Sequence, residues 1–223
     1  MGVVGLFSDT EGDVERVDAA LMFLRQRGAT RYFFMGNRYD DVEAWVKWKR
    51  DQARAQADYS DADFLEDVVD HLSGKEPRDR PPAFGQAYEA ARTAETLARL
   101  KDKVLRVPEK GCTAYGAPSV PRKLVDMMGD TLCCLVHDKN DLDKEDMTNA
   151  VVLIHGKGEA PAMVQIGPRY FVTPGKVTSP TPSVGLLEMD DKGLRFSAYA
   201  LSGQTLVEPT AISVGGRKKV SVS

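Results

Sequence analysis

The chain is poor in cysteine, and this scarcity excludes one class of small protein. Only three of its 223 residues are cysteines, and two of them, Cys133 and Cys134, are adjacent in an apolar segment. A small, odd number of cysteines argues against a disulfide scaffold and favours a reducing, cytoplasmic environment. We therefore interpret Cys133 and Cys134 as small residues of a hydrophobic core.

Long apolar runs and an excess of positive charge are also missing. No run approaches the roughly 18 residues that a membrane-spanning helix needs, and the first residues lack the basic region of a signal peptide. A net charge of −3 and a pI near 5.7 argue against a general nucleic-acid binder. What remains, with 42% hydrophobic and 28% charged residues, is the composition of a globular protein with one α/β domain.

The N-terminal part shows the pattern of a β-loop-α-β unit. The apolar run at 3–7 predicts a strand, and Asp13 is a suitable cap for a helix over about 14–27 that Gly28 ends. A second apolar run at 31–35 predicts the next strand. Because a helix connects them, we expect the two strands to be parallel.

The second half of the chain alternates short apolar runs with turn residues, which is typical of strands in a more antiparallel arrangement. The predicted strands are 103–107, 131–136, 151–154, 162–166, 169–173, 184–190, 194–200 and 205–208. We predict a single domain over 1–210, followed by a disordered tail over 211–223.

Residues 40–102 differ from the rest because they are charged, rich in alanine and without strand patterns. We predict a helical insertion with helices at about 40–57, 61–73 and 84–102. Trp45 and Trp48 lie one helical turn apart. They either pack on the domain or form a surface that recognises a partner protein.

Polar loops that contain glycine follow the predicted strands directly. Such loops meet at the carboxyl edge of an α/β sheet, where functional groups collect. Acids such as Asp40 and Asp41 could bind a metal there or could favour the N-terminus of the next helix. The loops are 8–12, 36–41, 108–112, 137–140, 155–161 and 173–176.

These loops resemble those of the calcineurin-like metallophosphoesterases, in particular the small bacterial and archaeal phosphodiesterases and the retromer subunit with the same fold. The family has D-x-H-G, G-D, a strand ending in histidine, G-H-x-H-x-P and N-P-G-S. This chain has D-T-E-G at 9–12, G-N at 36–37, V-H-D at 136–138, G-K-G-E-A-P at 156–161 and T-P-G-K at 173–176. The resemblance covers 1–39 and about 103–200. It implies an α/β sandwich of two mixed sheets flanked by helices, with the helical insertion added.

The resemblance also implies a two-metal site, but most of its ligand positions hold other residue types. Only Asp9 and His137 keep theirs. The first histidine is replaced by Glu11, the bridging aspartate by Asn37, and the two histidines of G-H-x-H by Lys157 and Glu159.

These replacements oppose metal binding. Asn37 offers a neutral carbonyl where two cations need a bridging anion, and the ammonium of Lys157 repels a metal ion instead of ligating it. We therefore expect no metal cofactor. We expect instead an ion pair between Lys157 and Asp9, Glu11 or Glu159, with Lys176 or Lys110 as a further cation.

The leading hypothesis is a degenerate phosphoesterase, a pseudoenzyme that acts as a protein-interaction or regulatory module. Its protein partner is unidentified, and the sequence does not indicate an oligomeric state. One alternative is an active phosphodiesterase or phosphatase with a remodelled centre that holds one Mn, Fe, Zn or Ni ion. The ligands of that centre would be Asp9, Glu11, His137 and Glu159.

A second alternative is a protein that binds a phosphorylated small molecule without hydrolysing it. Cationic side chains and loop amides would hold the phosphate. The candidate cations are Arg38, Lys157 and Lys176.

Overall fold

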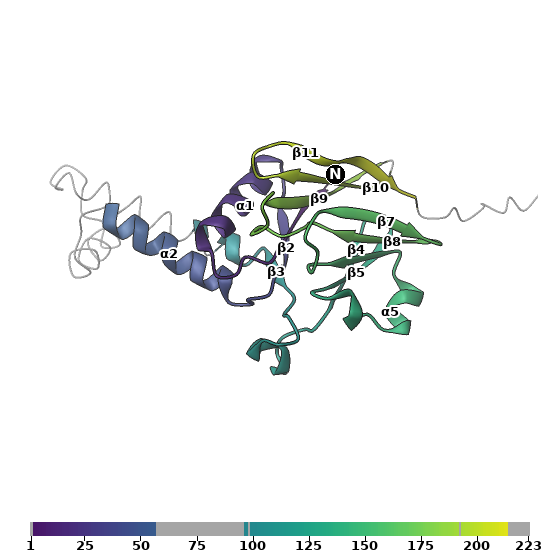
Figure 1. Ribbon diagram of the computed structural model, residues 1–223, viewed down its shortest axis with the longest axis horizontal. Coiled ribbons are helices and arrows are strands. Elements are labelled where there is room, and N and C mark those ends of the chain that lie inside the picture. The colour runs from purple at the N-terminus through teal and green to yellow at the C-terminus, as the bar shows by residue number, and fades with distance from the viewer. Residues whose placement is uncertain (1, 57–95, 98, 192, 214–223) are drawn as a thin grey trace, which may run out of the picture. The chain divides into compact units, whose positions relative to one another are not determined.

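The structure is a computed structural model that describes residues 2–56, 96–97, 99–191 and 193–213 (Figure 1). The chain divides into two compact units. The first consists of Met1–Asp41 and Val104–Ser223, and the second of Val42–Lys103. The second unit therefore differs by no more than two residues at either end from the predicted insertion at 40–102.

The described part of the first unit contains two mixed β-sheets. One sheet has the order β11-β10-β9-β1-β2-β3, and the other has the order β4-β5-β6-β8-β7. β1, β2 and β3 run parallel, as do β5, β6 and β8, while the remaining pairs are antiparallel. The strands are β1 (Gly2–Ser8), β2 (Arg31–Met35), β3 (Val104–Arg106), β4 (Leu124–Met128), β5 (Thr131–Val136), β6 (Val152–His155), β7 (Ala162–Ile166), β8 (Arg169–Thr173), β9 (Ser183–Asp190), β10 (Gly193–Ala200) and β11 (Thr205–Ile212).

The hydrophobic core lies between the two sheets, which face each other in Figure 1. Side chains of both sheets meet in it, including Leu6 and Phe33 from the first sheet and Leu135 and Ile154 from the second. Alternate residues of each strand point into this layer, so the period-2 pattern of the sequence is what closes the sandwich. The predicted fold class, an α/β sandwich of two mixed sheets, is confirmed.

Helices cover the outer faces of the sheets. α1 (Val14–Gln26) begins after Asp13, whose carboxylate accepts a hydrogen bond from the backbone N–H of Arg16 at 3.1 Å, and it buries Leu24. A Cβ at Gly5 would lie 2.9 Å from Cδ1 of Leu24, so this glycine lets α1 approach β1 closely.

The second sheet is covered by the short helices η3 (Lys139–Asp141) and α5 (Lys144–Asn149). On its outer face Cys134 packs with Ala150 and Leu153, whereas Cys133 faces the layer between the sheets. Both cysteines are core residues, as the sequence predicts. Burial raises the pKa of each thiol to about 12, so neither is a ready nucleophile.

The sequence missed β4 and underestimated β11. β4 is an edge strand in which Val125 and Met127 are exposed, and its methionines carry little strand preference. β11 continues to Ile212, which is buried in the core. The predicted tail therefore begins too early, at 211, and its remainder, 214–223, lies outside the described residues.

The second unit contains α2 (Asp41–Gln56), whose first residue still belongs to the first unit. Residues 96–97 and 99–101 are also helical, and Lys101 pairs with Glu43 of α2 at 3.3 Å. The first predicted helix is thus confirmed. The predicted helix at 61–73 and most of that at 84–102 lie outside the described residues. No helix in the described part of the chain is both long and apolar enough to cross a membrane.

Gly156 provides a test of how closely the two sheets approach. It follows β6, and a Cβ there would overlap the carbonyl oxygen of Met35 on β2. We expect Gly156→Ala to lower the free energy of unfolding by about 1–3 kcal/mol, because the backbone of one sheet must move. Urea denaturation measures this loss. Gly111→Ala is the control, since nothing lies within 4 Å of its Cβ position. Equal losses for both variants would contradict the close packing.

Candidate functional site

The carboxyl ends of β1 and β5 bring Asp9 and His137 into contact. Nε2 of His137 lies 3.1 Å from Oδ1 of Asp9, and both residues are buried. The other ring nitrogen, Nδ1, is buried and has no hydrogen-bond partner among the described residues. The two ligand positions that kept their residue type therefore bind each other across the two sheets.

Asn37, at the position of the bridging aspartate, supports the loop after β1. Its side-chain oxygen accepts a hydrogen bond from the backbone N–H of Glu11 at 3.3 Å. Glu11 has a positive φ of 51°, which is unusual for a residue other than glycine, and Gly12 follows with φ 85°. The amide of Asn37 thus helps to hold a left-handed turn, while the side chain of Glu11 remains exposed.

Asp41 is buried and anchors the same loop. Its Oδ2 accepts hydrogen bonds from the hydroxyl of Thr10 at 2.5 Å and from the N–H of Gly12 at 2.8 Å. Nε of Arg38 lies 3.5 Å from Oδ1. The sequence left open whether Asp40 and Asp41 bind a metal or favour a helix start. Asp41 is the first residue of α2, as the helix-start interpretation expects, and the side chain of Asp40 is exposed. No local sequence signal showed that Asp41 binds the loop after β1.

Lys157 does not form the ion pair that the sequence predicted. Its Nζ lies 2.8 Å from Oδ2 of Asp138, instead of pairing with Asp9, Glu11 or Glu159. The reason is the backbone: the N–H of Lys157 donates to the carbonyl of His137 at 2.8 Å. This bond sets Lys157 beside the residue that follows His137, so Asp138 is the nearest acid.

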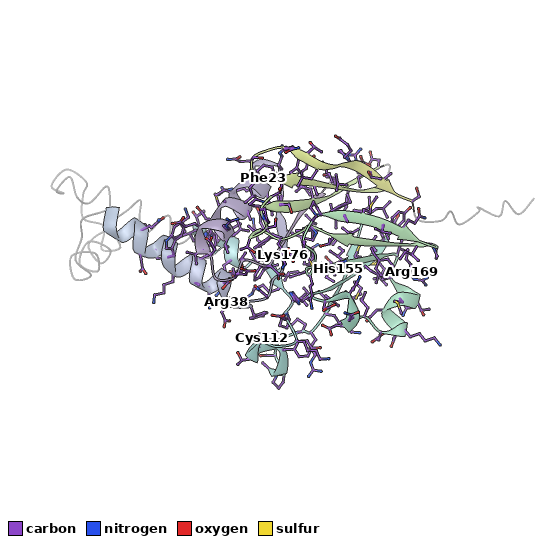
Figure 2. The ribbon with its side chains drawn as sticks, in the orientation of Figure 1. Phe23, Arg38, Cys112, His155, Arg169 and Lys176 are labelled. Atoms are coloured by element: carbon purple, nitrogen blue, oxygen red, sulfur yellow. The ribbon has the colours of Figure 1, made fainter. Side chains whose placement is uncertain are left out.

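Lys176, one of the two candidates for a further cation, pairs with an acid of this edge. Its Nζ lies 2.5 Å from Oε1 of Glu159, which raises the pKa of Lys176. The cationic side chains of Arg38, Lys157 and Lys176 therefore each have an acidic partner. Figure 2 labels Arg38 and Lys176, together with His155, whose Nδ1 lies 3.2 Å from the carbonyl oxygen of Lys157. Burial is the main reason why the pKa of His155 is lowered.

These residues do not fit the two-metal centre that the fold implies. Such a centre needs a bridging carboxylate and flanking imidazoles around ions about 3.5–4 Å apart. The amide of Asn37 is neutral and already accepts a hydrogen bond from the N–H of Glu11, and Lys157 is a cation. Within the described residues, no three or more histidine, cysteine, aspartate or glutamate side chains are grouped so that they could hold a metal ion.

Comparison with known proteins shows the fold. The sequence matches no protein-family model, and it matches no curated protein. Among solved structures, the phosphoesterase YfcE from E. coli has a TM-score of 0.54 and 18% identity, covering 95% of this chain and 100% of that chain. Vps29 from Chaetomium thermophilum has a TM-score of 0.50 and 12% identity, covering 94% and 96%. The similarity to small metallophosphoesterases and to Vps29 extends over most of the chain, and at these identities it shows the fold alone.

The ion pair of Lys157 generates a prediction about Asp138. The N–H of Asn140 and then the ammonium of Lys157 lower the pKa of this carboxyl. Because this pKa is lower in the folded than in the unfolded protein, the ionised carboxyl stabilises the folded state at pH values above the unfolded pKa of about 3.9. This stabilisation is lost as the pH falls through the folded pKa. In Lys157→Gln we expect the pKa of Asp138 to rise without reaching the unfolded value, since Asn140 remains.

Carbon-detected NMR titration of the Asp138 carboxyl measures this change. The control is Lys139→Gln, because Lys139 is an exposed cation next to Asp138 that does not pair with it. A pKa that stays the same in Lys157→Gln, or that rises as much in Lys139→Gln, would contradict the assigned ion pair.

Proposed function

We propose that this chain is a catalytically degenerate protein with the metallophosphoesterase fold, and that it acts as a protein-interaction or regulatory module. The observation that carries the proposal is that Asn37 and Lys157 are already engaged in contacts with other residues of the chain. Both occupy ligand positions of the fold, and both make contacts inside the protein that metal ligands would not make.

The charges of the edge support the loss of catalysis. Two-metal hydrolysis requires cations that polarise the phosphoryl oxygen and activate water. Here the fixed cations are the side chains of Lys157 and Lys176, and carboxylates neutralise them at 2.8 Å and 2.5 Å. Asp9, a ligand position that kept its residue type, is already in contact with His137. Apart from the buried Nδ1 of His137, the charged and polar groups named here are thus paired within the protein, which favours a structural role for this edge.

The second unit is the proposed interaction element. A sheet sandwich of this kind closes its core without Val42–Lys103, so the insertion adds surface that the fold does not require. Of its two tryptophans, Trp45 is buried and Trp48 is half-buried. The retromer subunit with the same fold is an analogy for a non-enzymatic role, since fold alone does not determine function.

A single-metal centre is the second candidate, because the contact of its two retained ligand types, Asp9 and His137, is compatible with it. Adjacent ligands of one ion with bonds of about 2.1 Å are roughly 3.0–3.4 Å apart. The 3.1 Å between His137 and Asp9 lies in this range as well as in that of a hydrogen bond. By contrast, the positive charges of Arg38, Lys157 and Lys176 are each partly neutralised by a carboxylate, which weakens the case for a phosphate-binding protein.

Metal content and hydrolysis test the loss of catalysis. Protein purified without chelator should contain well under one equivalent of Mn, Fe, Zn or Ni by elemental analysis. It should also hydrolyse bis-p-nitrophenyl phosphate no faster than buffer when Mn²⁺ is added. The matched control is the variant that restores the family ligands, Glu11→His, Asn37→Asp, Lys157→His and Glu159→His, which we expect to bind metal. Two equivalents in the natural chain would refute the proposal, and one equivalent would favour the single-metal centre.

Deletion of the second unit tests the interaction role. Nη1 of Arg106 donates to the carbonyl of Tyr39 at 3.1 Å, so the two ends of the first unit are close enough for a short linker. We expect a chain with a Gly-Ser linker between Asp41 and Val104 to keep a single cooperative unfolding transition in urea, followed by far-ultraviolet circular dichroism, since the core and the Asp41 contacts remain. Affinity purification from the source organism, compared with the full chain, should show the loss of a specific partner. A deleted chain that does not fold, or that retains every partner, would assign the second unit a structural role.

A further inference from the structure

The strand β7 forms one edge of the second sheet, and its outer side is open. It pairs with β8 on one side, and no strand of the described residues pairs with it on the other. Its last three residues are exposed, with 52% of Val164 and 60% of Ile166 accessible. An edge strand also presents backbone N–H and C=O groups that have no partner within the sheet. β7 therefore offers both backbone groups and apolar side chains to an added strand.

The other sheet edges in the described part of the chain have features that oppose such pairing. β11 contains Glu208 and Pro209, and proline has no backbone N–H to donate. β3 has only three residues and ends in Arg106. β4 has Asp126 at its centre, where the carboxylate pairs with Arg31 at 2.6 Å. β7, with the sequence Ala-Met-Val-Gln-Ile, contains neither a charged residue nor a proline. The usual protection against edge-to-edge pairing is thus missing at β7.

An apolar row on the outer face of the second sheet ends at β7. Val164 lies opposite Phe171 of β8, which is in register with Leu153 of β6, and Leu153 is in register with Cys134 of β5. Cys134 and Leu153 are buried, and Phe171 packs against them. Val164 is therefore the exposed end of a row that is otherwise covered. A strand added to β7 would extend this row and cover Val164.

The sequence of β7 favours a second β7 as the added strand. When two copies of a five-residue strand pair antiparallel about a two-fold axis, the middle residue faces its own copy. In β7 the middle residue is Val164, so two β-branched side chains meet and join the apolar rows of the two copies. The two outer positions of the same face, Ala162 and Ile166, lie opposite each other, so a small side chain meets a large one.

The other combinations of the two edges of this sheet are disfavoured. Pairing of β4 with a second β4 would place two Asp126 carboxylates opposite each other, and like charges directly opposite are destabilising. Pairing of β4 with β7 of another copy would leave a free edge at each end and would grow into a filament. Only the pairing of β7 with β7 is both closed and free of opposed charges.

We propose that the chain forms a two-fold symmetric dimer through antiparallel pairing of β7 with β7 of a second copy. The second sheets of the two copies then become one continuous sheet. Because one short strand from each copy forms the contact, the interface is small, and we expect a dissociation constant on the order of 0.1 mM. The dimer goes beyond the proposed loss of catalysis and does not depend on it, since no residue of β7 occupies a ligand position of the fold.

Sedimentation equilibrium of the full chain tests the dimer. The natural chain should change from monomer to dimer as its concentration rises through the expected dissociation constant. Val164→Lys should raise this constant at least about tenfold, because two ammonium groups meet on the two-fold axis. The matched control is Val125→Lys on β4, which is 59% exposed and should leave the constant unchanged. A natural chain that stays monomeric, larger species that grow with concentration, or loss of the dimer in the control would overturn the proposal.

A mixture of two variants tests the pairing register. Val164→Glu should also be monomeric, because two carboxylates meet, and it replaces Val164→Lys if that variant does not fold. Mixed in equal amounts, the Lys and Glu variants should form a heterodimer, since the axis then carries opposite charges. With Val164→Arg in place of an unfolded Val164→Lys, the mixture is prepared in the same way. Two folded variants that stay monomeric when mixed would overturn the pairing about Val164.

Hydrogen exchange of the backbone amides identifies the strand that is covered. In the natural chain, the amides of residues 162–166 should exchange more slowly above the dissociation constant than below it, whereas those of β4 should not change. Slow exchange that does not depend on concentration would show that a segment of the same chain covers β7, and it would overturn the dimer.

Discussion

The contact between Asp9 and His137 is the interaction around which the candidate site is built. Asp9 directly follows a strand of one sheet and His137 directly follows a strand of the other, so their 3.1 Å contact joins the carboxyl edges of the sandwich. Both groups are buried, and leaving one partner of a buried hydrogen bond unsatisfied typically costs about 1–3 kcal/mol. The loops that follow β1 and β5 therefore have their starting points fixed relative to each other.

Asn37 and Asp41 hold the loop after β1 by hydrogen bonds. Asn37 holds the turn at Glu11, and Asp41 holds the same turn from the start of α2 through Thr10 and Gly12. Hydrogen bonds to Asn37 and Asp41 thus organise this loop.

The second sheet contributes the outward-facing charges. The hydrogen bond from the backbone N–H of Lys157 to the carbonyl of His137 directs the lysine side chain toward Asp138. Lys176 forms an ion pair with Glu159. Each of the two lysines therefore has an acidic partner, so both positive charges are neutralised within the protein.

The amino-acid sequence by itself determined the strands with clear period-2 patterns, the capped helix after Asp13 and the loops that gather at one edge, because these depend on local spacing. The strand β4 was not predicted from the sequence, since an exposed edge strand with methionines has only a weak hydrophobic pattern. Sequence comparison by position also identified which ligand types were lost, at Glu11, Asn37, Lys157 and Glu159.

Only the tertiary structure decided what the replaced residues bind. Charge alone predicted that Lys157 would pair with Asp9, Glu11 or Glu159, whereas a backbone hydrogen bond to His137 directs it to Asp138. The role of Asp41 depends on a loop 29 residues earlier in the chain. Partner choice among several nearby charges is set by distances of a few ångströms, and these follow from how the two sheets pack, which the order of residues in the chain does not state.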